Sequence, residues 1–180
     1  MNSKALINII DSLDSTSATD ALSANQGRIL KVMIDNIEVP VEEKNIMTAG
    51  ITSNFTLTAS GNNRVPIDKQ IAKVGDKFTM SDGKIIVGSG ISYVKVSANA
   101  MMNSATTGAK NMTIYKNGEQ CAISMESRTL TASTNIAKAI APMLVPVQAG
   151  DYFELYLYGA VDDTLLSPSI RTYVTIEAVV

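Results

Sequence analysis

The spacing of the hydrophobic residues changes near residue 50: helical before that point, alternating after it. Leu6, Ile9, Ile10 and Leu13 follow the i, i+3, i+4, i+7 pattern of an amphipathic helix, which we therefore expect within residues 1–13. A helix of this length is unstable alone in water. It packs either on the axis of an oligomer of this chain or as an anchor in a larger assembly.

A longer helix is predicted at residues 18–37, after the turn-forming segment at residues 14–20. Ser17 and Asp20 have capping-box spacing, with Asp in place of Glu or Gln. Polar and apolar residues of this helix form one seam with heptad spacing, and we predict that it packs between identical chains in a short trimeric coiled coil. The seam residues are Leu22, Asn25, Ile29, Val32, Met33 and Asn36. The alternative is a helix that lies on the chain's own β domain.

Pro40 ends the helix, and residues 39–50 are predicted to be a linker. From residue 51 onward, apolar residues alternate with polar ones, as in β-strands with one buried face. Tight turns are predicted at Ser81–Lys84 and Lys116–Glu119, the second because Asn-Gly favours a hairpin. Strands are expected at residues 54–58, 70–74, 77–80, 84–87, 92–99, 111–116, 120–125, 136–147, 151–158 and 173–178. About ten short strands at this spacing favour an antiparallel jelly-roll β-sandwich.

Two polar segments between strands, residues 99–111 and 127–135, are predicted to be loops. Loops of this kind are natural ligand contacts. In the strand at residues 151–158, Phe153, Leu155 and Leu157 form an aliphatic face, and the tyrosines form the other face. Candidate ligand contacts are therefore Asn99, Asn103, Tyr156 and Tyr158. The alternative is that the polar loops are solvated connectors only.

Composition removes several classes of function. The net charge is −2, which argues against binding nucleic acid through a basic face. There is no histidine and only one cysteine, Cys121, which lies in an apolar run and is predicted to be a buried small side chain. Asp162 and Asp163 would point to opposite faces of a strand, although a loop could bring both to one calcium ion. We predict no catalytic residue, no metal and no cofactor.

No secretory signal or membrane-spanning segment is visible in the sequence. The apolar patch near the N-terminus is broken by Asn8 and Asp11, and no later apolar run approaches the length that crosses a bilayer. We therefore expect synthesis in the cytoplasm of the producing cell, without membrane insertion.

The helical segment resembles a recurrent segment of tailed-phage fibre and baseplate proteins, which has a Ser/Thr-rich cap and then the core D-A-L-S-A-x-Q-G-[KR]-x-L. The matching residues are Asp20, Ala21, Leu22, Ser23, Ala24, Gln26, Gly27, Arg28 and Leu30. In those proteins the segment is a short helical connector of trimeric fibres. The resemblance implies a phage structural protein.

The β region is similar to the jelly-roll heads of the tumour-necrosis-factor and complement globular-head class. The likeness is carried by Ile114, Lys116, Asn117, Gly118, Ala149, Gly150, Asp151, Tyr152, Glu154, Leu155 and Tyr173. Domains of this class assemble as three-fold trimers, so the resemblance implies a homotrimer.

Together these patterns predict a mainly β homotrimer with three parts: an N-terminal helical attachment segment (residues 1–38), a linker (39–50) and a jelly-roll head (51–180). The expected role is a short virion fibre, on the phage head or on the tail and baseplate, that binds other virion proteins through its N-terminus. Its head would attach to a glycan or protein of the host surface. The alternatives are a purely structural capsid decoration protein and, least favoured, an enzyme that degrades surface polysaccharides.

Overall fold

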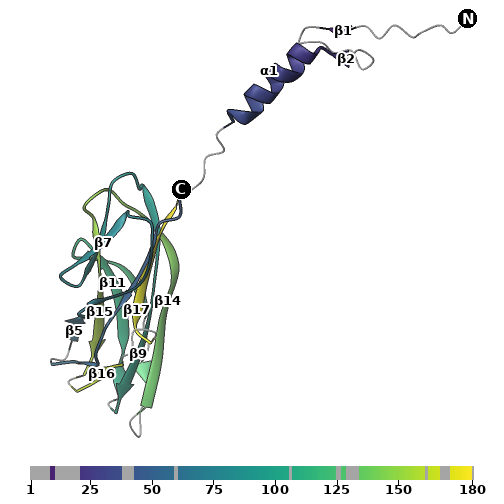
Figure 1. Cartoon of the computed structure of the whole chain (residues 1–180). Coiled ribbons are helices and arrows are strands. Elements are labelled where there is room, and N and C mark those ends of the chain that lie inside the picture. The colour runs from purple at the N-terminus through teal and green to yellow at the C-terminus, as the bar shows by residue number, and fades with distance from the viewer. Residues whose placement is uncertain are drawn as a thin grey trace, which may run out of the picture. The chain divides into compact units, whose positions relative to one another are not determined.

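The computed structural model describes residues 9–10, 21–37, 43–58, 61–105, 107–124, 127–128, 134–160, 162–166 and 171–179. The chain divides into two compact units, Met1–Val41 and Glu42–Val180. Figure 1 labels their helices and strands.

The first unit contains one helix, α1 (Ala24–Asp35), and a parallel pair of two-residue strands, β1 (Ile9–Ile10) and β2 (Ala21–Leu22). The predicted helix at residues 18–37 is therefore shorter than expected. The helix begins after Ser23, whose Oγ accepts a hydrogen bond from the Gln26 N–H at 3.2 Å. Ser23 and Gln26 have the S-x-x-Q spacing of a capping box, a better match to that motif than Ser17 and Asp20, which lie outside the described residues.

Two further predictions for this unit are wrong. Ile9 and Ile10, expected on a helix, form strand β1, where their backbone pairs with β2. Leu22 lies in β2 before the helix begins, so it cannot belong to the seam of α1. At the other end Asn36 is the C-cap residue, and its N–H donates to Val32 O at 3.1 Å.

The second unit is a sandwich of two antiparallel sheets (Figure 1). Seven strands form the first sheet: β3 (Ile46–Gly50), β4 (Phe55–Thr56), β6 (Lys69–Val74), β9 (Tyr93–Ser104), β14 (Thr134–Pro146), β16 (Thr164–Leu165) and β17 (Tyr173–Val179). Six form the second: β5 (Gly61–Arg64), β7 (Phe78–Ser81), β8 (Lys84–Val87), β11 (Asn111–Lys116), β12 (Glu119–Ser124) and β15 (Tyr152–Gly159). A separate short pair joins β10 (Gly108–Ala109) to β13 (Ser127–Arg128).

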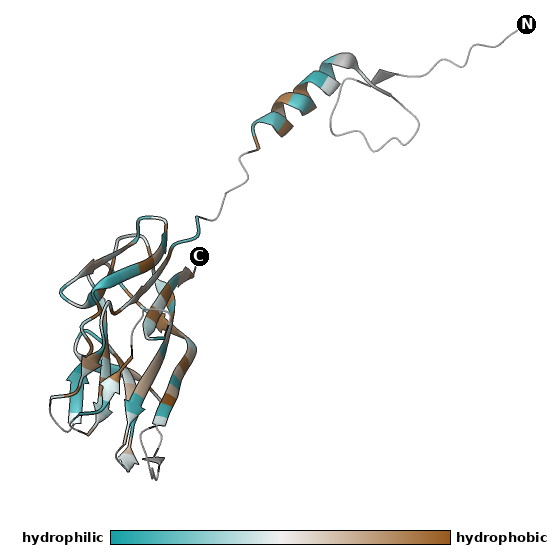
Figure 2. Cartoon of the chain, turned by 60° about the horizontal axis from the view of Figure 1, so that its bottom comes forward, coloured by the Kyte–Doolittle hydropathy of each residue, from teal (hydrophilic) through white to brown (hydrophobic). Residues whose placement is uncertain are grey.

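Alternation along the strands builds the core between the sheets. On β15, Phe153, Leu155 and Leu157 are buried as predicted, and on β9 Val94 and Val96 are buried. Figure 2 shows hydrophobic and hydrophilic residues interspersed along the strands of this unit. Each sheet therefore contributes one apolar face to a common core and keeps one outer face that its polar residues occupy.

The predicted tight turns are present. Asp82 and Gly83 connect β7 to β8, and Asn117 and Gly118 connect β11 to β12, all four with positive φ. Two central residues of positive φ match the right-handed twist of a hairpin, which is why Asn-Gly and Asp-Gly occur at such turns.

Three expectations in the β region are wrong. Residues 99–104, predicted to be part of a loop, continue β9 and pair with β14. Strand β3 occupies residues 46–50 of the predicted linker. In the second predicted loop, Ser127–Arg128 form β13 and residues 134–135 begin β14, while residues 129–133 lie outside the described part of the chain. Asn is depleted in strands, and the partner strand that orders these polar segments is distant in sequence.

Candidate functional site

The outer face of the second sheet gathers four of the six tyrosines of the chain. We call it the tyrosine face. Strand β15 forms its middle, with β11 on one side and β5 and β8 on the other. Its residues are Tyr152, Glu154, Tyr156 and Tyr158 on β15, Tyr115 on β11, and Asn62 and Arg64 on β5.

Contacts between side chains order this face. The rings of Tyr115 and Tyr156 lie with centroids 4.5 Å apart and planes tilted by 45°. The Asn62 Nδ2 donates a hydrogen bond to Tyr115 Oη at 3.3 Å. The Lys84 Nζ lies over the Tyr152 ring, 4.3 Å from its centroid. Tyr158 is exposed beyond the stacked pair.

The charges of the tyrosine face are paired with one another. Glu154 is buried between Tyr152 and Tyr156 on the strand, and its Oε1 lies 2.8 Å from Arg64 Nε. The same guanidinium donates to Asp82 O, and its Nη1 lies 3.5 Å from the Asp82 carboxylate. Burial, and then the nearby Glu154 carboxylate, raise the pKa of Tyr156. Tyr156 therefore remains a neutral phenol and an O–H donor in any physiological medium.

Asn111 contributes a buried polar atom beside this face. It lies on β11 opposite Tyr158 in the register of the two strands. Its Oδ1 is buried and has no hydrogen-bond partner among the residues that the structure describes. Such an oxygen is uncommon in folded proteins, where buried polar atoms are normally paired with protein or water.

The four predicted ligand contacts fall on two different sheets. Tyr156 and Tyr158 belong to the tyrosine face, whereas Asn99 and Asn103 lie on β9 in the first sheet. Asn99 Nδ2 donates to Arg171 O at 3.0 Å, and Asn103 Nδ2 donates to Asn135 Oδ1 at 2.9 Å. One chain therefore does not bring all four side chains to a single site, and their role as ligand contacts stays a prediction.

Sequence reasoning did not select Tyr115, Asn62 or Arg64. Tyr115 could have been found, because it alternates with the core residue Ile114 in a strand that was predicted. Asn62 and Arg64 lie on β5, whose sequence, Gly-Asn-Asn-Arg, resembles a turn more than a strand. Its pairing with β15 orders it.

The outer face of the first sheet has a different composition. We call it the small-residue face. Most of its side chains are short: Ser97, Asn99 and Asn103 on β9, Ala137 and Ala139 on β14, Thr175 on β17 and Thr48 on β3, with the longer Met101 and Tyr173 among them. Beside it, Leu144 on β14 is 57% exposed. The Thr48 and Thr175 hydroxyls are hydrogen-bonded at 3.0 Å. Short side chains of this kind let another backbone approach closely.

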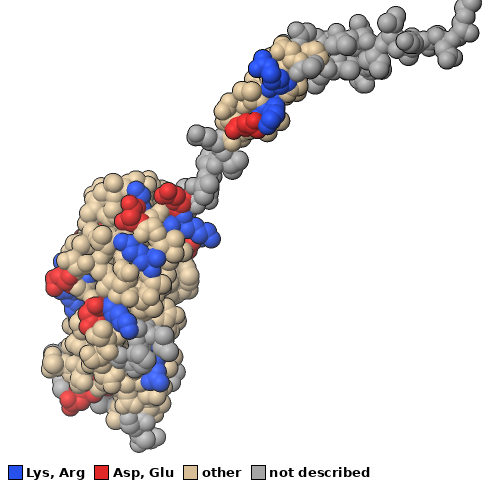
Figure 3. Space-filling view, viewed as in Figure 1, with Lys and Arg blue, Asp and Glu red and all other residues tan. Residues whose placement is uncertain are grey.

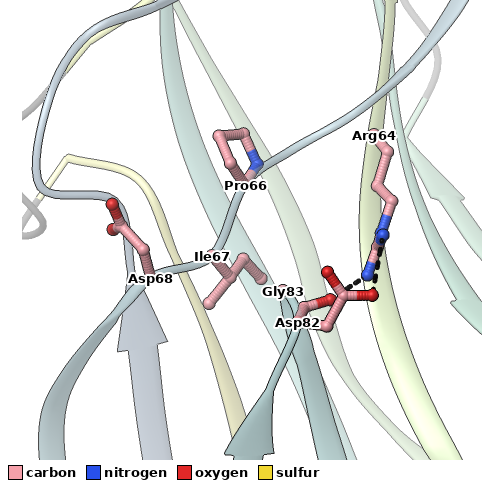
Figure 4. Close-up of a pocket in the computed structure, with 6 residues that line it drawn as sticks. All are labelled: Arg64, Pro66, Ile67, Asp68, Asp82 and Gly83. Atoms are coloured by element: carbon pink, nitrogen blue, oxygen red, sulfur yellow. Dashed lines mark hydrogen bonds and ion pairs between the residues drawn. The ribbon is translucent and has the colours of Figure 1, made fainter.

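A pocket of about 220 Å³ lies at the edge of the tyrosine face, lined by Arg64, Pro66, Ile67, Asp68, Asp82 and Gly83. In Figure 4 the Arg64 and Asp82 side chains point toward each other across it, and Asp68 points away from them. Asp68 accepts hydrogen bonds from Thr52 N at 2.8 Å and Thr52 Oγ1 at 2.5 Å. The carboxylates of this pocket therefore have structural partners.

Three of the residues that carry the head-domain resemblance, Lys116, Asn117 and Asp151, contact one another between two turns. Asp151 is buried, accepts from Asn117 Nδ2 at 2.7 Å and Gln148 N at 3.0 Å, and lies 2.9 Å from Lys116 Nζ. Burial of the carboxyl raises its pKa, but Lys116 and these hydrogen bonds outweigh it and hold the pKa of Asp151 below its usual value. A pocket of about 310 Å³ beside these contacts is lined by Lys116, Asn117, Pro146, Val147, Gln148 and Asp151.

Asp163 belongs to a buried ion pair. Its Oδ2 lies 2.6 Å from Lys110 Nζ and accepts from Ala160 N at 2.8 Å, and both charged side chains are 1% exposed. Burial raises the pKa of Asp163, but Lys110, Ser104 and the Ala160 N–H together lower it below the usual range. Asp162 differs, since it is exposed with positive φ. No group of three metal-ligating side chains occurs among the described residues.

Cys121 is half-buried, and its Sγ donates to Ile114 O at 3.4 Å. Burial raises the pKa of the Cys121 thiol, more than the backbone and Lys116 lower it. It is therefore a protonated thiol at neutral pH, without the lowered pKa of a reactive cysteine.

Helix α1 exposes its apolar seam. Val32 and Met33 lie on it, and Met33 is 56% exposed. Ile29 is half-buried, and Asn25 accepts a hydrogen bond from Arg28 at 3.3 Å. A Cβ at Gly27 would meet nothing within 4 Å, so nothing in one chain requires the glycine. In the part of the chain that is described, no helix is long and apolar enough to cross a membrane.

Comparisons with known proteins agree with both parts of this description. Residues 9–38 match the family model described as phage tail fiber repeats. Solved structures similar to the chain include murine APRIL at pH 5.0, with a TM-score of 0.62 and 11% identity over 76% of this chain and 99% of that one. Another is Eiger TNF from S. frugiperda, with a TM-score of 0.59 and 9% identity over 76% of this chain and 92% of that one. No curated protein sequence matches.

These matches support the coarse predictions. The second unit is a tumour-necrosis-factor-like jelly roll, as expected, and the repeat match indicates a phage fibre protein. The likeness to the solved structures rests on 8–11% identity, so it establishes the fold alone.

Proposed function

We propose that this chain is a short, non-enzymatic fibre of a phage particle that forms a homotrimer and attaches to the host surface through its jelly-roll unit. The observation that carries the proposal is the order of the two parts. A segment that matches phage tail fiber repeats, residues 9–38, is followed directly by the tumour-necrosis-factor-like unit. The repeat segment joins the other virion proteins, on the head or on the tail and baseplate, and the β unit faces the host.

Two surfaces support the trimer. Most side chains of the small-residue face are short, and the seam of α1 carries exposed apolar side chains. Figure 3 shows that charged residues are sparse and of both signs on the visible surface of the β unit. Low charge and exposed apolar side chains are typical of surfaces that identical subunits bury.

The ionisable groups support a non-enzymatic role. Asp151, Asp163 and Glu154 are buried, and each is engaged by a cation of the fold itself. Two of them have lowered pKa values, whereas general acids need raised ones.

Light scattering of the full chain tests the trimer, and a monomer at micromolar concentration would contradict it. Immunogold labelling of particles tests the location. Adsorption of the purified protein to a panel of bacterial strains tests attachment. If the particles are labelled but the protein adsorbs to no strain, the protein has a structural decoration role and not an attachment role.

A further inference from the structure

We infer that the tyrosine face is a binding site for an uncharged saccharide. This inference rests on the proposed attachment function, because it names the site and the ligand class through which the β unit holds the host surface. It also separates Tyr156 and Tyr158 from Asn99 and Asn103, which lie on the opposite sheet.

The first argument is the aromatic surface. Tyr115 and Tyr156 hold each other at a fixed tilt, and Tyr158 is exposed beside them on the same strand face. The negative face of a tyrosine ring attracts polarised C–H groups, which a pyranose ring presents on its apolar side. Tyrosine also loses little conformational entropy on binding, since only two side-chain torsions are fixed.

The second argument is the set of hydrogen-bonding groups around the rings. Because Asn62 donates to Tyr115 Oη, the Tyr115 O–H proton is directed to another acceptor. Because the pKa of Tyr156 is raised, its phenol stays protonated and provides a second O–H donor. The exposed Asn62 side chain and the phenol oxygens supply acceptors. Sugar hydroxyls both donate and accept, and so they match this mixture.

The third argument is charge. Arg64 is compensated by Glu154 and Asp82, and Lys84 lies over Tyr152. An anionic polymer would need an uncompensated cation at the centre of the face. The centre instead holds Arg64, 34% exposed, in an ion pair with the buried Glu154.

The test uses the full chain and free, short oligosaccharides, so that avidity does not mask single contacts. The probes are neutral oligomers of glucose, galactose, rhamnose and N-acetylglucosamine, together with oligogalacturonate and glycerol-phosphate oligomers as anionic probes. Titration by NMR or calorimetry gives the dissociation constant. We expect binding of at least one neutral probe and of no anionic one.

Four variants locate the site. Tyr156→Ala and Tyr158→Ala are each expected to weaken binding about tenfold, the loss typical of one aromatic contact. Tyr158→Phe retains the ring and should stay within about threefold of the parent chain. Lys73→Ala, on the exposed strand β6 of the other sheet, is the matched control and should change nothing.

Circular dichroism of each variant separates loss of the site from loss of the fold. Any one of three results would overturn the inference: binding that survives both alanine variants, a preference for the anionic probes, or no binding to any probe.

Bacterial cells distinguish its failure from that of the proposed function. Adsorption that is lost after periodate treatment supports a saccharide. Adsorption that is lost only after protease treatment overturns the saccharide and leaves attachment standing. No adsorption to any strain overturns both.

Discussion

The two outer faces of the sandwich share one core but differ in their side chains. The small-residue face presents mainly alanine, serine, threonine and asparagine, with Met101 and Tyr173 among them and an exposed Leu144 beside it. The tyrosine face presents four large rings around the ion pair of the buried Glu154 and the half-buried Arg64. A surface of short side chains suits close packing against flat backbone, whereas rings with polar rims suit a small ligand.

The difference shows how one alternating pattern can serve two purposes. In both sheets the inward residues are mostly apolar and almost fully buried, so the core leaves the outward residues free to vary. The resemblance of the chain to tumour-necrosis-factor-like structures is a resemblance of cores and turns. The outer faces decide what such a domain binds.

The largest effect is expected from the ion pair that joins the two sheets. Lys110 directly precedes β11 of the second sheet, and Asp163 directly precedes β16 of the first. In Asp163→Asn the Lys110 ammonium loses its buried counter-charge, and the free energy of unfolding should fall by about 3–5 kcal/mol. Urea denaturation measures it. In hydrogen-exchange measurements, the backbone amides of both sheets should exchange faster than in the parent chain.

Asp162→Asn is the matched control, because the neighbouring carboxyl is exposed. It should change the free energy of unfolding by less than about 0.5 kcal/mol. Equal losses in the two variants would show that the ion pair does not contribute. Because the folded-state pKa of Asp163 is lowered, its stabilisation is present above the unfolded pKa of about 3.9 and is lost as the pH falls through the folded pKa.

Arginine placed on one face at a time tests the comparison most directly. Ala139→Arg puts a charged side chain in the middle of the small-residue face, where a neighbouring subunit would bury it. The dissociation constant of the trimer should rise at least about a hundredfold, since an unpaired charge in an interface costs several kcal/mol. Analytical ultracentrifugation gives the constant.

Tyr158→Arg places the same side chain on the tyrosine face and should leave the trimer intact. If only Tyr158→Arg dissociates the trimer, the tyrosine face, and not the small-residue face, lies between subunits.

Asp151 offers a smaller, pH-dependent effect at the turns that end β11 and β14. Asp151→Asn removes the charge that Lys116 faces at 2.9 Å, and should lower the free energy of unfolding by about 1.5–3 kcal/mol at pH 7. The folded pKa of Asp151 is lowered, so the parent chain loses this advantage as the pH falls through it. Denaturation at several pH values should show the two curves converging in acid. Curves that stay parallel would exclude the carboxylate as the cause.

Much of the fold could be predicted because strand periodicity and turn chemistry are local. The strands at residues 84–87 and 111–116 have the predicted bounds, and both Asp-Gly and Asn-Gly turns are present. What failed depends on distant partners. Residues 99–104 look like a polar loop, and only β14, about 35 residues later, orders them into β9. Strand β5 likewise depends on β15.

The candidate site was only half predictable for the same reason. Tyr156 and Tyr158 are two residues apart in one strand, so the alternation of side chains places both on the same face. Tyr115 and Asn62 join them through strand pairing between segments about 40 and 95 residues away, which periodicity does not contain. In the helix, the N-cap is Ser23, whose S-x-x-Q spacing matches a capping box better than Ser17 and Asp20 do.

The smallest expected effect compares one side-chain pair from each face. Tyr115 and Tyr156 are in ring contact across β11 and β15, and Thr48 and Thr175 share a hydrogen bond across β3 and β17. A double-mutant cycle to alanine should give a coupling energy of about 0.5–1.5 kcal/mol for the tyrosines and about 0.2–1 kcal/mol for the threonines. If the trimer buries the threonines, their coupling should grow with protein concentration across the dissociation range, whereas the tyrosine coupling should not. A tyrosine coupling that depends on concentration would instead mean that the rings lie between subunits, where a saccharide could not reach them.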